Sequence, residues 1–309
     1  MSEPIKLSAS SIGTYSTCPR RYWYHKLSGL ESRDTTSSAL DRGSLFHVGM
    51  AAALRQTNPK LNLKVAIEAI GALYVAGTGS VTERDEAVEM VKYFAEDIGI
   101  NVRNFAYKIN GVPAVELEFD ENFGDFNLRG SIDAVIRDTD GRTFLLDWKT
   151  RKRHYEDIVV QNDKQLAIYA AILKREGIEL DGALQIQLSA PPQPLKFKVD
   201  SDISLASSLN ERSAKTTQAM FDESIAHMSA SERLLAQMKL GNKVAPDTDF
   251  KKLSFIDLND VDTMFETVLK WGHRIAQEKE FLPVMDSWVC GSCSFLTECR
   301  ASLKGKKVD

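Results

Sequence analysis

The feature that most constrains the fold is a pair of apolar segments joined by a short polar link. The first covers residues 130–137 and the second covers residues 144–150. Between them lie Asp138, Asp140 and Gly141, which are residue types that favour turns. The sequence therefore predicts two antiparallel strands joined by a tight connection.

The two predicted strands place acidic and basic side chains on shared faces. Side chains alternate along a strand, so Asp147 and Lys149 are expected on one face of the second strand. The expected apolar faces are Phe144, Leu146 and Trp148 on the second strand, and Ile132, Ala134 and Ile136 on the first. Asp133 is expected opposite that apolar side of the first strand, so both acids and the lysine can converge on one patch of a sheet.

Two carboxylates in an apolar sheet are costly unless a positive charge lies between them. A hard divalent cation such as Mg²⁺ binds oxygen ligands, and two carboxylates with a backbone carbonyl suit it. A lysine beside them can orient a metal-bound water or neutralise charge that develops on a phosphate. The alternative is a surface hairpin with ordinary Asp and Lys, and the Gly130-x-x-Asp133 pattern upstream favours the site.

Length and charge leave several classes open. The 309 residues suit one large domain or two modest ones. The net charge is −4 and the pI is near 5.8, so the whole protein does not carry the field of a nucleic-acid binder. A local basic run, Arg151, Lys152 and Arg153, follows the second strand and predicts either a phosphate track or a solvated face.

No signal peptide or membrane-length apolar run is evident, so we expect a cytosolic protein with no membrane partner and without disulfides. No G-x-x-x-x-G-K-[ST] motif occurs, which excludes an ATP-driven motor of the phosphate-loop type.

The N-terminal part is predicted to be mainly helical. A capped helix begins at Ser8 and is interrupted at Cys18–Pro19. Arg20 and Arg21 follow among aromatic residues. These side chains either bind a nucleic-acid strand through charge and stacking, or the aromatic ones belong to the hydrophobic core. A second helix is expected to begin near residues 42–44 and to carry His47 in its first turns.

Further elements are expected along the rest of the chain. The pattern predicts two helices over residues 63–107, a strand from Val112 that includes Glu116 and Glu118, an amphipathic helix over 165–173, strands at 182–190 and 195–199, and helices over 203–240 and 259–280. Glu116 and Glu118 either add a carboxylate to the site or form an exposed strand face, and neither is counted among the predicted site residues. Gln165 and Tyr169 lie four residues apart and share one helix face.

Cysteines gather near the two ends of the sequence. Cys290, Cys293 and Cys299 lie within ten residues, and Cys18 is the fourth cysteine. Three interpretations remain open: free structural thiols, a Cys₄ zinc site, or a [4Fe–4S] cluster. Zinc sites usually use two C-x-x-C pairs, whereas a cluster accepts irregular spacing, so the pattern favours the cluster.

Six motifs in one order resemble the RecB-like branch of the PD-(D/E)XK nuclease superfamily, and more closely its iron–sulfur exonucleases, which include CRISPR-associated members and stand-alone phage relatives. These motifs are Cys18 with Pro-Arg-Arg, Gly43-x-x-x-His47, Gly130-x-x-Asp133, Asp147-x-Lys149, Gln165-x-x-x-Tyr169, and Cys290-x₂-Cys293-x₅-Cys299. The resemblance covers nearly the whole chain. It departs at Asp147, where many relatives carry Glu, which leaves the metal preference open.

The resemblance implies a site and a fold. His47, Asp133, Asp147 and the carbonyl of Trp148 would hold Mg²⁺ or Mn²⁺. Lys149 would position and activate water, and Gln165 and Tyr169 would orient the site. The implied fold is α/β, with a central mixed sheet flanked by helices, additional helical regions, and a [4Fe–4S] cluster on the four cysteines that joins the termini.

The expected activity is hydrolysis of DNA phosphodiester bonds by an exonuclease acting on single strands or ends, in recombination or end processing in a bacterial cell or phage-infected host. The alternatives are a nuclease component of a CRISPR adaptation or repair complex, associated with a protein partner or with further copies of the chain, and a non-catalytic DNA-binding relative. Residues 1–309 are expected to form one nuclease domain, with a helical part over 1–110, the catalytic core over 111–200, a helical part over 201–285 and the cysteine segment over 286–309.

Overall fold

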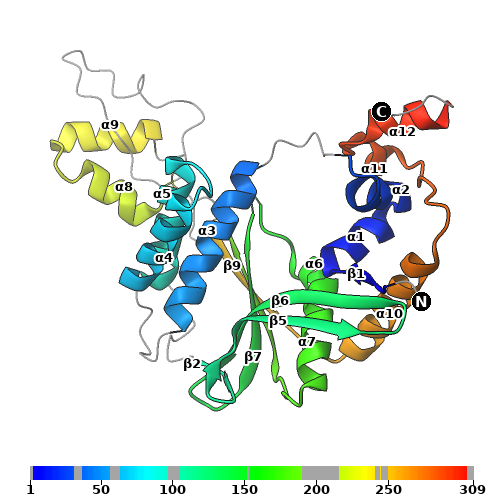
Figure 1. Ribbon diagram of the computed structural model, residues 1–309. Helices are drawn as coiled ribbons and strands as arrows, with labels where there is room; N and C mark the ends of the chain where they lie inside the picture. The colour runs from blue at the N-terminus through cyan, green and yellow to red at the C-terminus, as the bar shows by residue number, and fades with distance from the viewer. Residues whose placement is uncertain are drawn as a thin grey trace.

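The computed structural model describes residues 3–30, 37–55, 63–96, 105–151, 153–189, 216–240, 244 and 250–304. It has a central mixed sheet with helices on both faces (Figure 1). The strands are β1 (Ile5–Leu7), β2 (Phe105–Ala106), β3 (Lys108–Ile109), β4 (Val112–Pro113), β5 (Val115–Asn122), β6 (Phe126–Arg137), β7 (Thr143–Thr150), β8 (Gly182–Leu188) and β9 (Lys251–Ile256). The expected α/β class with a central mixed sheet flanked by helices is confirmed.

The helices surround this sheet in two groups. They are α1 (Ala9–Thr17), α2 (Pro19–Tyr22), the π-helical turn η1 (Trp23–Leu27), α3 (Ser37–Leu54), α4 (Leu63–Val75), α5 (Val81–Glu96), α6 (Asp157–Gln161), α7 (Lys164–Arg175), α8 (Gln218–Ile225), α9 (Ala230–Leu240), α10 (Val261–Gln277), α11 (Ser287–Gly291) and α12 (Leu296–Leu303). Figure 1 shows α3, α4 and α5 on one side of the molecule and α1, α2, α11 and α12 on the other, with the sheet at the base.

The sheet runs in the order β1-β6-β7-β8-β9, and β2 and β5 also pair with β6. The pairs β1–β6 and β7–β8 are parallel, and the remaining pairs in this sheet are antiparallel. The strand order therefore takes strands from the N-terminal part and from the part after residue 201, as well as from the predicted core over 111–200.

The predicted hairpin is present as β6 and β7. Ala134 pairs with Leu146 in antiparallel register. In the turn, Asp138 Oδ1 accepts hydrogen bonds from the backbone N–H groups of Asp140 and Arg142, both at 2.9 Å. These bonds hold the turn that the Asp and Gly residues predict.

The predicted apolar face of the first strand is wrong at Ile132. Ile132 packs in one core cluster, whereas Ala134 and Ile136 pack in the other, on the opposite face of the sheet. The ladder between β5 and β6 is interrupted between these positions, and Glu116 has a φ of 49°. A positive φ is uncommon for a residue other than glycine, and here it coincides with the break in the ladder between β5 and β6. Period-two counting assumes an unbroken ladder, so it fails at this point of β6.

Two hydrophobic clusters cover the two faces of the sheet. One includes Tyr15 of α1, Leu166 of α7 and Phe265 of α10, and the other includes Phe46 of α3 and Ile70 of α4. Burial on both faces explains why the sheet strands are rich in Val, Ile and Leu.

Several predicted boundaries differ from the structure. Helix α3 begins at Ser37 instead of near residue 42. Gly43 lies inside this helix and serves close packing, since a Cβ there would lie 3.1 Å from Thr150 Oγ1. The predicted helix over residues up to 107 is wrong at its end, where Phe105–Ala106 pairs with β6 as a strand. The predicted strand at 195–199 and the first part of the predicted helix at 203–240 lie outside the described residues.

Elements from the N-terminal and C-terminal parts of the chain, α2 with η1 and α11 with α12, lie together on one side of the molecule (Figure 1). The rings of Tyr24 and Phe295 stack with centroids 5.5 Å apart, and the Tyr24 hydroxyl lies 3.2 Å from Ser302 Oγ. Arg20 also donates to Ser302 Oγ at 3.3 Å. None of the described helices is long and apolar enough to cross a membrane.

Replacing Gly272 tests the packing of α10 on the sheet. A Cβ at this position would overlap the ring of Phe126 in β6. We expect Gly272→Ala to lower the free energy of unfolding by about 1–3 kcal/mol, measured by urea denaturation. Gly71→Ala in α4 is the matched control, since a Cβ there meets nothing within 4 Å. It should raise stability by about 0.5–1 kcal/mol; a Gly272→Ala protein as stable as this control would contradict the packing.

Candidate active site

Two acidic side chains lie buried on the central strands. Asp133 in β6 is 5% exposed, and Asp147 in β7 is fully buried. Asp133 Oδ2 accepts a hydrogen bond from the backbone N–H of Trp148 at 2.9 Å. Burying carboxylates is unfavourable without partners, so the groups around them define the site.

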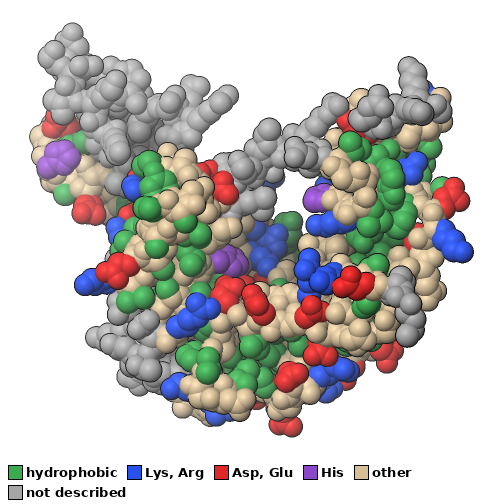
Figure 2. All heavy atoms as spheres, in the orientation of Figure 1, with side chains coloured by type: hydrophobic (Ala, Val, Ile, Leu, Met, Phe, Trp, Pro, Cys, Tyr) green, Lys and Arg blue, Asp and Glu red, His purple; other side chains and the backbone are tan. Residues whose placement is uncertain are grey.

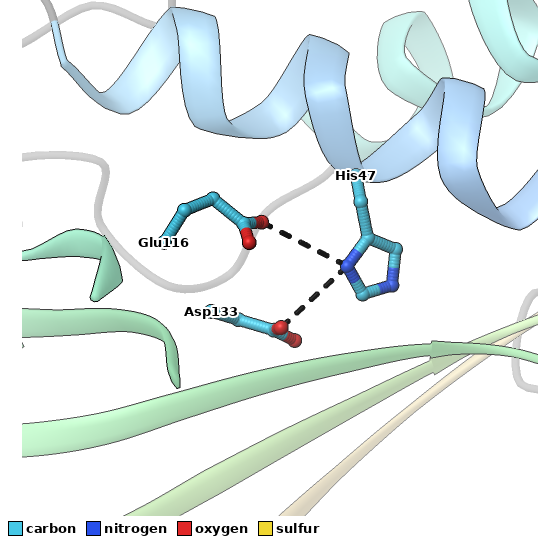
Figure 3. A group of neighbouring side chains, drawn as sticks. All are labelled: His47, Glu116 and Asp133. Carbon is cyan, nitrogen blue, oxygen red and sulfur yellow. Dashed lines mark ion pairs between the residues drawn. The ribbon is translucent and has the colours of Figure 1, made fainter. Parts of the chain in front are cut away.

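His47 of α3, Glu116 of β5 and Asp133 point toward one another (Figure 3). The Nδ1 atom of His47 lies 3.5 Å from Asp133 Oδ1 and 4.0 Å from Glu116 Oε1. Among the described His, Cys, Asp and Glu residues, this is the set of three whose ligand atoms all lie within 4.8 Å of one another. One imidazole and two carboxylates are suitable ligands for a divalent cation.

The chemistry of Glu116 supports this fit. Its Oε2 accepts a hydrogen bond from Ser131 at 3.0 Å, but its buried Oε1 has no hydrogen-bond partner among the described residues. Burial, and then the charge of Asp133, raise the pKa of Glu116 above its ordinary value. A buried oxygen without a donor beside a second carboxylate is an arrangement that a cation would stabilise.

Of the two interpretations that the sequence left open for Glu116, the structure therefore favours a carboxylate at the site. The left-handed φ of 49° at Glu116 turns the strand and interrupts the ladder opposite Asp133. The position of Glu116 was the signal that sequence reasoning could have used for its role at the site. Its strand, β5, pairs antiparallel with β6, so a Glu on this neighbouring strand near Asp133 was a candidate. Glu118, which the sequence could not separate from it, is exposed.

A chain of hydrogen bonds joins the second acid to α7. Lys149 Nζ donates to Asp147 Oδ1 at 2.7 Å and to Gln165 Oε1 at 3.1 Å. Gln165 Nε2 donates to the hydroxyl of Tyr169 at 2.7 Å. The structure thus brings together Asp147, Lys149, Gln165 and Tyr169, which were predicted as site residues.

Gln185 of β8 is a further member that sequence reasoning missed. Its side chain is fully buried, and its Nε2 donates to Asp147 Oδ2 at 3.0 Å and to Asp163 Oδ2 at 3.3 Å. Asp163 caps α7 by accepting from the N–H of Gln165. One amide therefore links the buried strand acid to the start of the helix that carries Gln165 and Tyr169. Only the parallel register of β7 and β8, with Asp147 opposite Gln185, shows this role.

Burial and charge shift the pKa values in this network. Burial raises the pKa of Asp147 to about 6, although Lys149 acts in the opposite direction and Asp133 adds to the rise. Burial alone lowers the pKa of Lys149, but Asp147 and Asp133 outweigh it and leave that pKa above its ordinary value. Burial also raises the pKa of Tyr169. The ammonium of Lys149 thus remains charged and holds Asp147 and Gln165 together.

A cavity of about 700 Å³ opens beside these groups. Its lining includes Gly43, His47, Arg55, Glu116 and Lys149. Figure 2 shows that this face of the molecule is hollowed between its two helical sides, with basic side chains and a histidine at the base of the hollow. His47, Glu116 and Lys149 are therefore open to a substrate from one side, with the buried Asp133 behind them.

Trp148 lies between Asp147 and Lys149 in the sequence and is fully buried. Its ring contacts the ring of His47, with centroids 5.8 Å apart and planes at 71°. The ring nitrogen Nε1 has no hydrogen-bond partner among the described residues. The assignment of the Trp148 carbonyl as a metal ligand stays a prediction.

The residues predicted to bind nucleic acid occupy different environments. The guanidinium of Arg20 lies 5.4 Å from the ring centre of Trp23 and bonds Ser302, so it ties the two ends of the chain together. Arg21 is half-buried and Arg153 is exposed, whereas Lys152 lies outside the described residues. Arg151 stacks on Tyr155, with its guanidinium carbon 3.9 Å from the ring centre.

The four cysteines are free thiols that lie near one another at the meeting point of the chain ends. Burial raises the pKa of Cys299, and the other cysteines raise it further, so all four belong to one electrostatic neighbourhood. Arg20 acts on Cys299 in the opposite direction. Segments nearly the whole chain apart are thus brought together, as a shared metal group requires.

Comparison with known proteins assigns the family. The family model described as the PD-(D/E)XK nuclease superfamily matches residues 6–300. The chain belongs to the PD-(D/E)XK nuclease superfamily. It therefore carries a metal-dependent nuclease domain, and the described residues include a candidate acidic metal site, His47, Glu116 and Asp133.

Other comparisons add little. No curated protein matches the chain. The chain is similar to a solved structure titled "Crystal structure of SSO0001", with 12% sequence identity and a TM-score of 0.38. That likeness covers 97% of this chain and 88% of the other. Likeness at this level supports no statement about fold or activity.

Replacing Glu116 tests its role at the metal site. Glu116→Gln keeps the shape and removes one ligand charge, so we expect affinity for Mn²⁺ to fall by roughly 10-fold or more in titration calorimetry. Glu118→Gln on the same strand is the matched control, because this side chain is exposed, and it should leave affinity unchanged. Equal Mn²⁺ affinity in the two variants would show that Glu116 is not a ligand.

Proposed function

We propose that this nuclease is a DNA exonuclease that hydrolyses phosphodiester bonds on single strands or at DNA ends, with Mg²⁺ or Mn²⁺ as its metal. The observation that carries the proposal is the convergence of His47, Glu116 and Asp133 beside the Asp147–Lys149 pair at the base of an open cavity. The resemblance of the ordered motifs to RecB-like exonucleases supports the end-directed activity. Recombination or end processing in a bacterial cell or phage-infected host would be its setting.

Each side chain has a distinct part in this proposal. His47, Glu116 and Asp133 would hold the metal ion, with Asp147 and the carbonyl of Trp148 beside them. When bound, a divalent ion polarises the phosphoryl oxygen and stabilises the leaving oxygen. Lys149 would orient the attacking water through its ammonium, which already donates to Asp147 and Gln165. No covalent intermediate is needed, because water attacks phosphorus in line.

Gln165 and Tyr169 would position these groups. Gln165 accepts from Lys149 and donates to Tyr169, so it fixes the direction of the ammonium. The Tyr169 ring packs edge-on to Phe119, with centroids 5.9 Å apart. Gly130 leaves room for this contact, since a Cβ there would lie 2.8 Å from the Phe119 ring. The Gly130-x-x-Asp133 motif thus joins a packing requirement to a ligand.

Cleavage assays with end-labelled substrates test the proposed activity. We expect Mn²⁺-dependent release of nucleotides from labelled DNA by the wild type. Asp147→Asn and Lys149→Met should lower the rate by roughly 100-fold or more, because each removes charge that acts on the transition state. Labels at either end report the polarity of digestion, and circular DNA should resist cleavage.

Asp140→Asn in the hairpin turn and Lys108→Met in β3 are the matched controls, since both residues are exposed and lie outside the site. Both should cut at the wild-type rate. If Asp147→Asn cut as fast as these controls, the assigned site would be wrong. Cleavage of circular DNA at the linear rate would contradict the end-directed activity.

We propose further that Cys18, Cys290, Cys293 and Cys299 hold a [4Fe–4S] cluster that joins the chain ends. Their common electrostatic neighbourhood supports a shared group. Zinc sites usually use two C-x-x-C pairs, whereas this chain offers one such pair, Cys290 and Cys293, with two separate cysteines, and that irregular spacing favours the cluster. Its role would be structural, since it closes a loop of nearly the whole chain.

Metal analysis of anaerobically purified protein tests the cluster. We expect iron and acid-labile sulfide in equal amounts, with visible absorbance that dithionite or air changes. Cys18→Ser and Cys299→Ser should lose most of the iron and lower the melting temperature. Ser292→Ala, between two of the cysteines, is the control and should keep the iron. Stoichiometric zinc without iron in the wild type would contradict the cluster.

A further inference from the structure

Arg151 and Tyr155 form a stacked pair just after the C-terminal end of β7, the strand that carries Asp147 and Lys149. The guanidinium carbon of Arg151 is 3.9 Å from the ring centre of Tyr155, which is closer than the other described Arg–aromatic contacts. The Tyr155 side of the pair is open, since this residue is 46% exposed. An exposed aromatic ring with a cation on one face suits a ligand that has both charge and a flat surface.

The backbone of Tyr155 is held in place by buried groups. Its N–H donates to Gln187 Oε1 at 2.6 Å, and its carbonyl accepts from Gln187 Nε2 at 3.2 Å. Gln187 of β8 is fully buried. Lys252 of β9 donates to the same carbonyl at 2.9 Å. Three hydrogen bonds thus hold the N–H and the carbonyl of Tyr155 in place. A ring carried on such a backbone is preorganised, so binding of a ligand that stacks on it costs little conformational entropy.

The pair lies close to the proposed reaction centre. Arg151 continues the pairing of β7 with β8, since its N–H donates to the carbonyl of Leu188 at 2.7 Å. Lys149 and Arg151 are two residues apart in this extended segment, so they share a face and lie roughly 7 Å apart along it. This spacing is comparable to one step of an extended single strand of nucleic acid. The Nε of Arg151 is also buried and has no hydrogen-bond partner among the described residues.

We propose that Arg151 and Tyr155 form a binding site for one unpaired nucleotide of the substrate strand, next to the phosphate that is cut. The Tyr155 ring would stack on the base and Arg151 would contact the adjacent phosphate. A base inside a duplex is stacked on both faces and cannot use the ring, so the site selects single-stranded substrate. This inference deepens the proposed nuclease function and rests on it.

Equilibrium binding to two labelled oligonucleotides tests the site. One is a short oligothymidylate, and the other is an abasic strand with the same number of phosphates. Fluorescence anisotropy in EDTA measures affinity without turnover. We expect Tyr155→Ala to weaken binding of the oligothymidylate by roughly 10-fold and to leave the abasic strand unchanged. Tyr155→Phe should bind both like the wild type, because it keeps the ring.

Arg151 is expected to act through charge as well. Arg151→Gln should weaken both strands and lower the salt dependence of binding by about 0.7 in the slope of log K against log salt. Tyr74→Ala is the matched control, because Tyr74 also carries an arginine, Arg84, over its ring at 4.9 Å, but between α4 and α5. It should bind both strands like the wild type. Thermal melts of each variant verify folding.

The outcomes separate the inference from the function on which it rests. If wild-type protein cuts DNA with Mn²⁺ but Tyr155→Ala binds both strands as the wild type does, or loses both equally, the nucleotide site is overturned and the nuclease stands. If the wild type cuts neither single-stranded DNA nor DNA ends, the proposed function fails, and the nucleotide site fails with it. If it cuts DNA ends but does not bind single strands, only the nucleotide site is overturned. The site is supported if Tyr155→Ala, but not Tyr155→Phe, loses affinity for the oligothymidylate and keeps its affinity for the abasic strand.

Discussion

The structure depends on keeping charged groups inside a sheet that is covered on both faces. Asp133 and Asp147 are buried between two hydrophobic clusters, where an uncompensated carboxylate is unfavourable. The chain compensates with a backbone N–H from Trp148, with the ammonium of Lys149 and with the amide of Gln185. Each partner comes from a central strand, so the strand register fixes the site. The oxygens left over, on the His47 side, are those that a cation would complete.

This compensation also ties the helices to the chemistry. Gln185 bonds both Asp147 and the residue that caps α7, and α7 in turn carries the Gln165–Tyr169 pair. On the other face, α3 brings His47 over Asp133. Helices on the two sides of the sheet thus contribute to one site through the same pair of strands. A shift of either layer would separate the groups, which is why packing contacts such as Gly43 against Thr150 belong to the function as much as to stability.

Much of the fold and of the candidate site could be predicted from the sequence. The hairpin followed from its turn, and the helix breaks at Pro19 and around residues 76–80 followed from Pro and Gly. The grouping of Asp147 with Lys149 followed from alternation along a strand. Alternation failed at Ile132 and Glu116, because a left-handed residue interrupts the ladder there, and no local pattern signals that conformation in a glutamate. Arg20 was predicted to bind nucleic acid from its charge and its aromatic neighbours. In the structure it packs on the nearby Trp23 and bonds Ser302 at the other end of the chain, and no local pattern predicts this second contact.

The sequence by itself determined the types of group that the site can contain and the local elements that carry them, because turns, caps and period-two patterns act over a few residues. Tertiary structure alone decided which of them meet. It turned Glu116 toward His47 and placed Gln185 opposite Asp147. It also brought Cys18 to the cysteines near residue 299. These contacts join segments far apart in the chain, and their formation depends on strand register and helix packing, which burial of the two apolar clusters selects.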